Sequence, residues 1–195
     1  MSGTVKGERE AVERIVRGAF GALTGRRGEV LRYAMMDDTP VGVLGMAAGP
    51  SGLRHLNFVR GEDDFLQHLL AEHGDVPLLK SVELDDVRRA LERYFAGKRL
   101  DFQLTVDLGD LGDFHRRVLG ETAKIPAGRV ATYTQVAARA GSPRASRAAG
   151  NALHNNPVAI VVPCHRVLRS DGSLGGYGGG LPIKEWLLRH EGALL

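Results

Sequence analysis

The chain has 195 residues, of which 43% are hydrophobic, and it contains a single cysteine. One cysteine excludes an internal disulfide and a four-cysteine zinc site. The first ten residues lack the apolar core of a signal peptide, and no run approaches the roughly 20 apolar residues that span a bilayer. We therefore expect a soluble protein without a membrane partner, located in the cytoplasm near the nucleoid, or in the nucleus of a eukaryote.

Charge is distributed unevenly along the chain. Residues 1–108 carry 15 Lys and Arg against 17 Asp and Glu, a net charge of −2, whereas residues 109–195 carry 11 against 6, a net charge of +5. Nine of the eleven cations in the second part are arginine, the side chain best suited to phosphate contact. An excess of this size is only weak support for a nucleic-acid partner.

The first half of the chain predicts helices around a small sheet. Apolar residues at helical spacing predict a helix over residues 12–23. Turns rich in Pro, Gly and Asp then separate three short apolar segments, which predict an antiparallel meander over 29–36, 41–47 and 53–59.

Two more helices are predicted before residue 100, one reaching about residue 73 and one ended by Gly97. Alternating apolar residues over 102–106 indicate a strand or an extended linker. Nothing in this half gathers catalytic residue types, and we assign no role to its histidines, His55, His68 and His73.

From about residue 109 the sequence predicts a helix-turn-helix. A helix containing Phe114 comes first, and a short helix begins near Tyr133 and stops at Gly141. Ser142 can cap the next helix, and Pro143 suits its first position. Two helices joined by so tight a turn are typical of this motif.

The second helix of this pair has small side chains on one face and a polar face formed by Arg144, Arg147, Asn151 and His154. A solvated face is one interpretation of these arginines. A DNA-facing helix is the other, favoured because arginines, little side-chain bulk and the helix-turn-helix position occur together.

The cysteine lies in the stretch Ile160–Val167, whose apolar residues predict a strand that ends at Pro163. A lone Cys in an apolar run is by default a small buried hydrophobe. A free thiol with a pKa of about 8.5 needs a base or a positive field to react. His165 and Arg166 follow Cys164 directly, so a reactive thiol is the alternative.

Beyond the cysteine, residues 167–174 predict a β-hairpin or wing with its turn at Asp171–Gly172. The glycine-rich stretch 175–180 has no Walker lysine and no dinucleotide fingerprint, and better suits the wall of a pocket for a flat ligand.

A last helix is predicted to begin near Pro182. Glu191 near its end is either a solvated acid or the carboxylate of a Cys-His-Glu relay that charges His165 and holds the thiol as thiolate.

These residues carry a family resemblance, and the motif is Pro163-Cys164-His165-Arg166-Val167, with Asn156-Pro157 before it and Gly176-Tyr177, Lys184 and Glu191 after it. It resembles the O6-alkylguanine-DNA alkyltransferases (methylated-DNA–protein-cysteine methyltransferases) from about residue 111 to the C-terminus. The resemblance implies an α+β protein with a ribonuclease-H-like N-terminal domain over 1–108 and a winged-helix domain over 109–195. We expect no cofactor and no metal among the site residues, and a monomer that binds double-stranded DNA containing O6-alkylguanine.

The resemblance also implies how the alkyl group is transferred. Cys164 accepts it from guanine O6 irreversibly, in a single turnover, and His165 removes the thiol proton through a water. Glu191 polarises His165, and Asn156 steadies the turn and connects it to the DNA-binding helix.

Further residues are implied to bind the substrate. Arg147 fills the gap left by a flipped nucleotide, while Tyr133 crowds the target phosphate and then donates to the base. The carbonyls of Cys164 and Val167 read the exocyclic amine of the base. The complete predicted binding set is Tyr133, Val167, Tyr177 and Gly178 for the base, and Arg147, Tyr133, Arg144, Ala148 and Gly150 for DNA.

The sequence departs from the family pattern at a few positions. Gly178 stands where many relatives have serine or another side chain, but the implied contact there is a backbone N–H, which glycine keeps. The cysteine-rich, zinc-binding regulatory domain of the adaptive-response relatives is absent, so we expect a stand-alone repair protein.

Three other classes remain as alternatives. A Cys-His-Glu hydrolase would turn over repeatedly, and a winged-helix regulator would bind a preferred sequence without using the thiol. Alkyltransferase-like lesion binders lack the acceptor cysteine, so Cys164 argues against that class.

Overall fold

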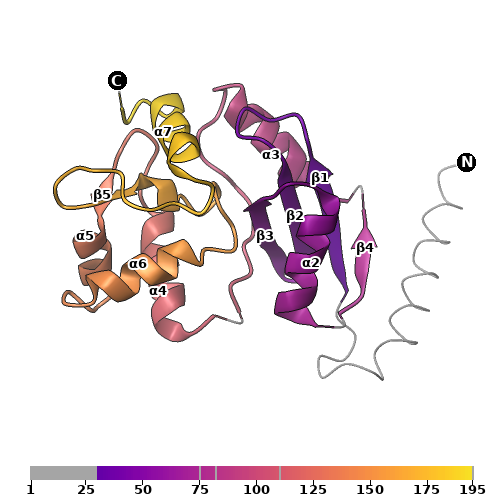
Figure 1. Cartoon of the computed structure of the whole chain (residues 1–195), viewed down its shortest axis with the longest axis horizontal. Coiled ribbons are helices and arrows are strands. Elements are labelled where there is room, and N and C mark those ends of the chain that lie inside the picture. The colour runs from indigo at the N-terminus through magenta and orange to yellow at the C-terminus, as the bar shows by residue number, and fades with distance from the viewer. Residues whose placement is uncertain (1–29, 75, 82, 110, 195) are drawn as a thin grey trace, which may run out of the picture.

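The computed structural model describes residues 30–74, 76–81, 83–109 and 111–194. The helix predicted over 12–23 lies outside these residues. Figure 1 shows two units side by side, an N-terminal one built on a sheet and a C-terminal one built mostly of helices. Within the described residues, no helix combines the length and the apolar character needed to cross a membrane.

The N-terminal sheet contains the predicted meander. β1 (Leu31–Met36), β2 (Leu44–Gly49) and β3 (Gly52–Phe58) pair antiparallel in sequence. A fourth strand that the sequence did not predict, β4 (Leu78–Lys80), pairs in parallel with β1 and completes the order β3-β2-β1-β4. Three residues are too few for their alternation to be recognised.

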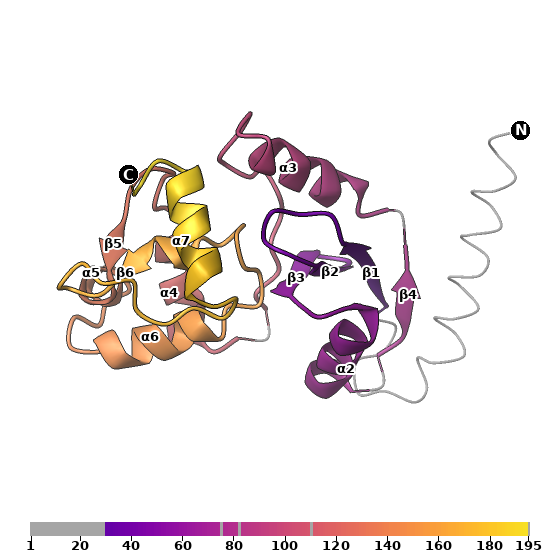
Figure 2. The ribbon, with the colours of Figure 1, turned by 45° about the horizontal axis from the view of Figure 1, so that its top comes forward.

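Two helices cover opposite faces of this sheet (Figure 2). On one face, α2 (Glu62–His73) buries Phe65 and Leu69 in a small cluster with Tyr33 and Ala47. On the other, α3 (Asp85–Phe95) buries Val87, Leu91 and Tyr94 in the main core. The apolar residues of α3 recur every three or four positions, which is the spacing that places them on one face of a helix.

The C-terminal unit contains the predicted helix pair. Its elements are α4 (Asp113–Ala123), β5 (Ala131–Thr132), α5 (Tyr133–Arg139), α6 (Ser146–His154), the 3-10 helix η1 (Cys164–Arg166), β6 (Val167–Leu168) and α7 (Leu181–His190). The prediction that Ser142 caps the second helix is wrong. A turn in which the Ala145 N–H donates to the Ser142 carbonyl (2.9 Å) comes first, and α6 begins only at Ser146.

Two predictions around the cysteine are also wrong. Residues 158–162 form tight turns instead of a strand, and Ile160 has a φ of +68°, which is strained for a β-branched residue. The predicted hairpin has only its first strand, β6, which pairs in parallel with β5, and a turn closed by the Arg169 N–H on the Ser173 carbonyl follows. Apolar composition alone cannot distinguish a buried turn from a buried strand.

The two units share one continuous core and several backbone hydrogen bonds. The Leu56 N–H on β3 donates to the Pro157 carbonyl (2.8 Å), and the Ala159 N–H donates back to Leu56 (2.9 Å). The extended segment predicted over 102–106 is present, and Leu53 bonds to Thr105 and Asp107 on it. The edge strand β3 therefore holds the segment that leads to Cys164.

Candidate active site

The thiol lies at the start of a 3-10 helix and is held there by a buried amide. Cys164 is 8% exposed, at the first position of η1. Asn156 donates from Nδ2 to the Cys164 sulfur (3.1 Å) and to the Val162 carbonyl (2.8 Å), while its Oδ1 accepts from the Val158 N–H (3.1 Å). Asn156 therefore braces the strained turn and contacts the reacting atom itself.

His165 and Glu191, which are 26 residues apart, meet in the interior. His165 Nε2 lies 2.9 Å from Glu191 Oε1, and both side chains are fully buried. Because the carboxylate is ionised, Nε2 carries the proton and Nδ1 keeps a free lone pair. Nδ1 is buried and has no hydrogen-bond partner among the described residues. The contact predicted between these side chains is present, and it leaves Nδ1 as the basic atom.

Glu191 is the centre of a wider network. Arg166 donates from Nε to Oε2 (2.7 Å) and from Nη2 to Oε1 (2.8 Å), and the Tyr94 hydroxyl donates to Oε1 (2.7 Å). Burial by itself would raise the pKa of Glu191. The hydrogen bonds from His165 and Arg166 outweigh burial and lower this pKa to about 2.

This network orients His165 without charging it, which corrects the expectation of a resting thiolate. Burial lowers the pKa of His165 more than Glu191 raises it, and the positive charges of Arg166 and Lys184 lower it further. Burial likewise raises the pKa of the Cys164 thiol, and the Asn156 amide offsets this only in part. The resting pair is therefore a neutral thiol and a neutral imidazole.

A cavity of about 680 Å³ opens onto the thiol. Cys164, Tyr133 and Tyr177 contribute to its lining, together with residues of α6 and the loop after β6. The pKa of Tyr133 is raised by burial and by the nearby thiol, so the phenol keeps its proton at neutral pH. The cavity thus combines a nucleophile with a hydroxyl donor.

Helix α6 forms the rim of this cavity. Arg147 and Gly150 both line it, and Arg147 and Ala148 are exposed. Arg144 is also exposed but lies in the turn before α6. A Cβ on Gly150 would lie 3.7 Å from the Tyr133 ring, so the small residue keeps the helix close to that tyrosine.

A buried lysine holds two backbone carbonyls beside the site. Lys184 on α7 donates to the carbonyls of Val167 (2.7 Å) and Leu174. Its burial lowers its pKa to about 8. The Val167 carbonyl, predicted to read the base, therefore already accepts one hydrogen bond and has one lone pair left.

The glycine-rich loop contributes Tyr177 but not Gly178 to the lining of the cavity. Gly178 is exposed, with no other atom within 4 Å of where a Cβ would be. The Tyr177 ring packs against Phe58 of β3 at 5.7 Å, and a Cβ on Gly179 would lie 2.7 Å from that Phe58 ring. The N-terminal unit therefore sets the position of this loop.

The site residues predicted from the sequence do not include Tyr94, Arg166 or Lys184. Arg166 could have been recognised because it belongs to the Pro-Cys-His-Arg block. Tyr94 had no such signal, since it lies 97 residues before Glu191 and in the other unit. Among the described residues, one group of side chains could hold a metal ion, and it does not line this cavity.

Comparison with known proteins agrees with this geometry. Residues 31–108 match the ribonuclease-like domain of 6-O-methylguanine DNA methyltransferase, and residues 113–193 match the DNA-binding domain of the same family. The methylated-DNA–protein-cysteine methyltransferase of Methanosarcina acetivorans is 38% identical over 162 residues, covering 83% of this chain and 99% of the relative.

Two further relatives match different shares of the chain. The human methylated-DNA–protein-cysteine methyltransferase is 54% identical over 80 residues, 40% of this chain and 39% of the relative. The crystal structure of Mycobacterium tuberculosis OGT in complex with DNA superposes with a TM-score of 0.71 at 33% identity, over 83% of this chain and 93% of that one. Because both family domains match in order and a relative is matched over nearly its full length, the chain belongs to the 6-O-methylguanine DNA methyltransferase family.

Proposed function

We propose that this protein repairs DNA by direct reversal, transferring the alkyl group of O6-alkylguanine to its own cysteine in a single irreversible turnover. The observation that carries the proposal is the position of Cys164. The only thiol of the chain lies in a cavity whose rim is formed by the arginine-bearing helix α6. Relatives named methylated-DNA–protein-cysteine methyltransferase support the reaction, and the M. tuberculosis complex supports DNA as the partner.

The chemistry follows from the neutral resting pair. The thiol proton moves to His165 Nδ1 through a water as sulfur attacks the alkyl carbon. The S–C bond forms, and the C–O6 bond breaks with its electron pair left on guanine. Tyr133 donates a proton toward the departing base, so that guanine does not leave as an anion. Glu191 stabilises the imidazolium that forms on His165, and the thioether cannot revert.

The buried position of the thiol requires that the nucleotide leave the duplex. Extruding a base costs a few kcal/mol, and an alkylated guanine costs less because it pairs poorly. We infer that Arg147, exposed on the rim at the second position of α6, fills the space left in the double-stranded DNA. The small residues Ala148 and Gly150 let α6 approach a groove closely, while Arg144 contacts the phosphates.

The test is the intact mass of the protein after incubation with a duplex containing O6-methylguanine. We expect every active molecule to gain one methyl group, which peptide mapping places on Cys164. A Cys164→Ala variant should gain none while still binding the duplex. Absence of the gain, or its persistence in Cys164→Ala, would contradict the proposal.

The same experiment distinguishes the other classes. A hydrolase would release product continuously, whereas we expect product equal to the protein added and then no more. A winged-helix regulator would bind a preferred sequence and show no transfer. We also propose that the protein acts as a monomer, which sedimentation with and without DNA can test.

A further inference from the structure

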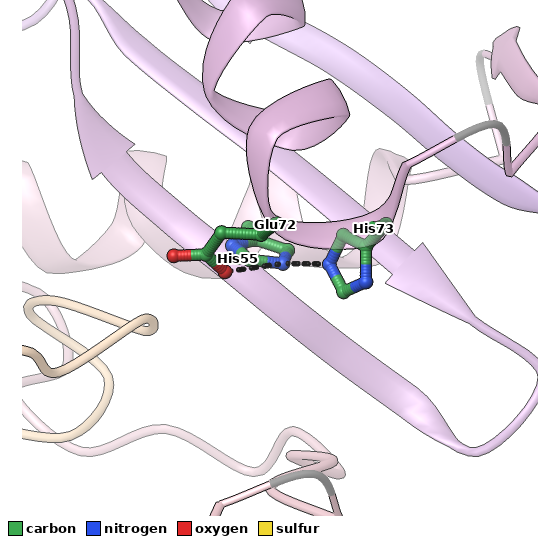
Figure 3. A group of neighbouring side chains, drawn as sticks. All are labelled: His55, Glu72 and His73. Atoms are coloured by element: carbon green, nitrogen blue, oxygen red, sulfur yellow. Dashed lines mark hydrogen bonds and ion pairs between the residues drawn. The ribbon is translucent and has the colours of Figure 1, made fainter.

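A second cluster of ionisable side chains lies in the N-terminal unit, outside the cavity that contains Cys164. His55 comes from β3, while Glu72 and His73 come from the last turn of α2, which crosses over that strand (Figure 3). One ligand atom from each of the three lies within 4.8 Å of the other two. The sequence assigns these histidines no role because its spacing does not show that strand residue 55 lies beside helix residue 73.

The sheet register explains why the three residues meet. His55 is the cross-strand partner of Ala47, and directly opposite residues on antiparallel strands point to the same face. Ala47 packs beneath α2 with Phe65 and Leu69, so the same helix covers His55. His55 is 2% exposed, so its ring is buried between β3 and α2.

The distances within the cluster are short. His55 Nε2 lies 2.7 Å from His73 Nε2 and 3.8 Å from Glu72 Oε2. His68, one turn earlier on α2, places Nε2 3.6 Å from Glu72 Oε1. That His68 nitrogen is buried and makes no hydrogen bond to another described residue. Three imidazoles and one carboxylate therefore converge on one end of α2.

We propose that His55, Glu72 and His73 bind a divalent transition-metal ion of the zinc type, with His68 available as the fourth ligand. Imidazole nitrogens and a carboxylate oxygen suit zinc, copper or nickel better than magnesium or calcium, which prefer oxygen ligands alone. Neutral imidazole is the form that binds metals.

Binding requires only small adjustments of the side chains. Without a metal, the 2.7 Å separation corresponds to an N–H···N hydrogen bond between His55 and His73, in which one Nε2 carries the proton. Tetrahedral zinc with Zn–N bonds of about 2.0–2.1 Å holds two nitrogens about 3.3 Å apart, so the rings separate by roughly 0.6 Å. The shared proton moves to Nδ1 of its ring, which leaves both Nε2 lone pairs for the metal.

The location indicates what the ion would do. It would join the C-terminal end of α2 to β3, the strand whose Leu56 bonds to Pro157 and Ala159 on the segment leading to Cys164. The site is therefore structural, with no ligand in the proposed alkyl-transfer chemistry.

The test uses full-length protein without a histidine tag, stripped with a chelator and titrated with ZnCl2 by calorimetry. We expect one zinc ion per chain and a melting temperature that rises with zinc concentration, as mass action requires. Replacing a ligand, in His73→Asn or in Glu72→Gln, should weaken binding by about 10-fold or more. His115→Asn, a histidine on α4 outside the cluster, is the matched control and should bind as the parent does.

Cys164→Ser excludes the thiol as the binding site, because its zinc affinity should equal that of the parent. Nitrogen-15 NMR of the histidine rings should show both His55 and His73 protonated at Nδ1 after zinc is added. Glu72 is exposed, so Glu72→Gln should keep the metal-free melting temperature. The proposal would be overturned by the absence of saturable zinc binding, by ligand variants that bind zinc as tightly as the parent, or by loss of binding in Cys164→Ser.

Discussion

Replacing Glu191 by Gln tests whether the carboxylate is the centre of the site. Glutamine keeps the size of the side chain but removes the charge that accepts hydrogen bonds from Arg166, His165 and Tyr94. Arg166 is 5% exposed, so the variant leaves a buried guanidinium without its counter-ion. Removing one partner of a buried ion pair costs about 3–5 kcal/mol.

The lowered pKa of Glu191 gives a similar magnitude for the folding free energy that this side chain contributes. Lowering it from the ordinary 4.5 to about 2 corresponds to about 3 kcal/mol of folding free energy at neutral pH. Because the folded-state pKa is the lower one, this stabilisation is present above pH 4.5 and is lost as the pH falls toward 2. Glu191→Gln should lack that part of the acid dependence.

The assays are urea unfolding at several pH values and single-turnover transfer from an O6-methylguanine duplex. We expect Glu191→Gln to lose about 3 kcal/mol at pH 7 and to transfer at least about 100-fold more slowly, since His165 loses the group that orients it. Adding Arg166→Met should restore part of the stability but not the rate, because it removes the uncompensated charge. A loss below about 1 kcal/mol, or a double variant no more stable than Glu191→Gln, would refute the reasoning.

Three further predictions concern other parts of the site. Arg147→Ala should slow transfer from duplex DNA by about 10-fold or more while transfer from free O6-alkylguanine base stays unchanged, because only the duplex requires extrusion; equal losses on both substrates would contradict this. Asn156→Ala removes the amide that lowers the pKa of Cys164, so the pH profile of iodoacetamide labelling should move to higher pH; a shift to lower pH would contradict this role of the amide. Gly179→Ala places a Cβ 2.7 Å from the Phe58 ring and should cost about 1–3 kcal/mol in urea unfolding; unchanged stability would show that the loop can move away freely.

Much of the fold could be predicted because it depends on local patterns. The strands of the meander, helices α2 to α5 and α7, and the position of the thiol after a proline all followed from periodicity, turn residues and one recognisable motif. The errors around the cysteine lie where buried backbone leaves regular structure. Residues 158–162 are as apolar as a strand, but the backbone of Leu56 on β3 donates to Pro157 and accepts from Ala159, and Ile160 turns the chain.

The site, too, could be predicted only in part from the sequence. By itself the sequence determined which chemical groups are present: one thiol, a histidine and an arginine beside it, an asparagine before it, and arginines on a helix of small residues. Their protonation states depend on the tertiary structure alone. Burial keeps Cys164 and His165 neutral, and Tyr94, from the other unit, completes the hydrogen-bond network around Glu191. Charge state depends on burial and on partners distant in the chain, and sequence spacing contains neither.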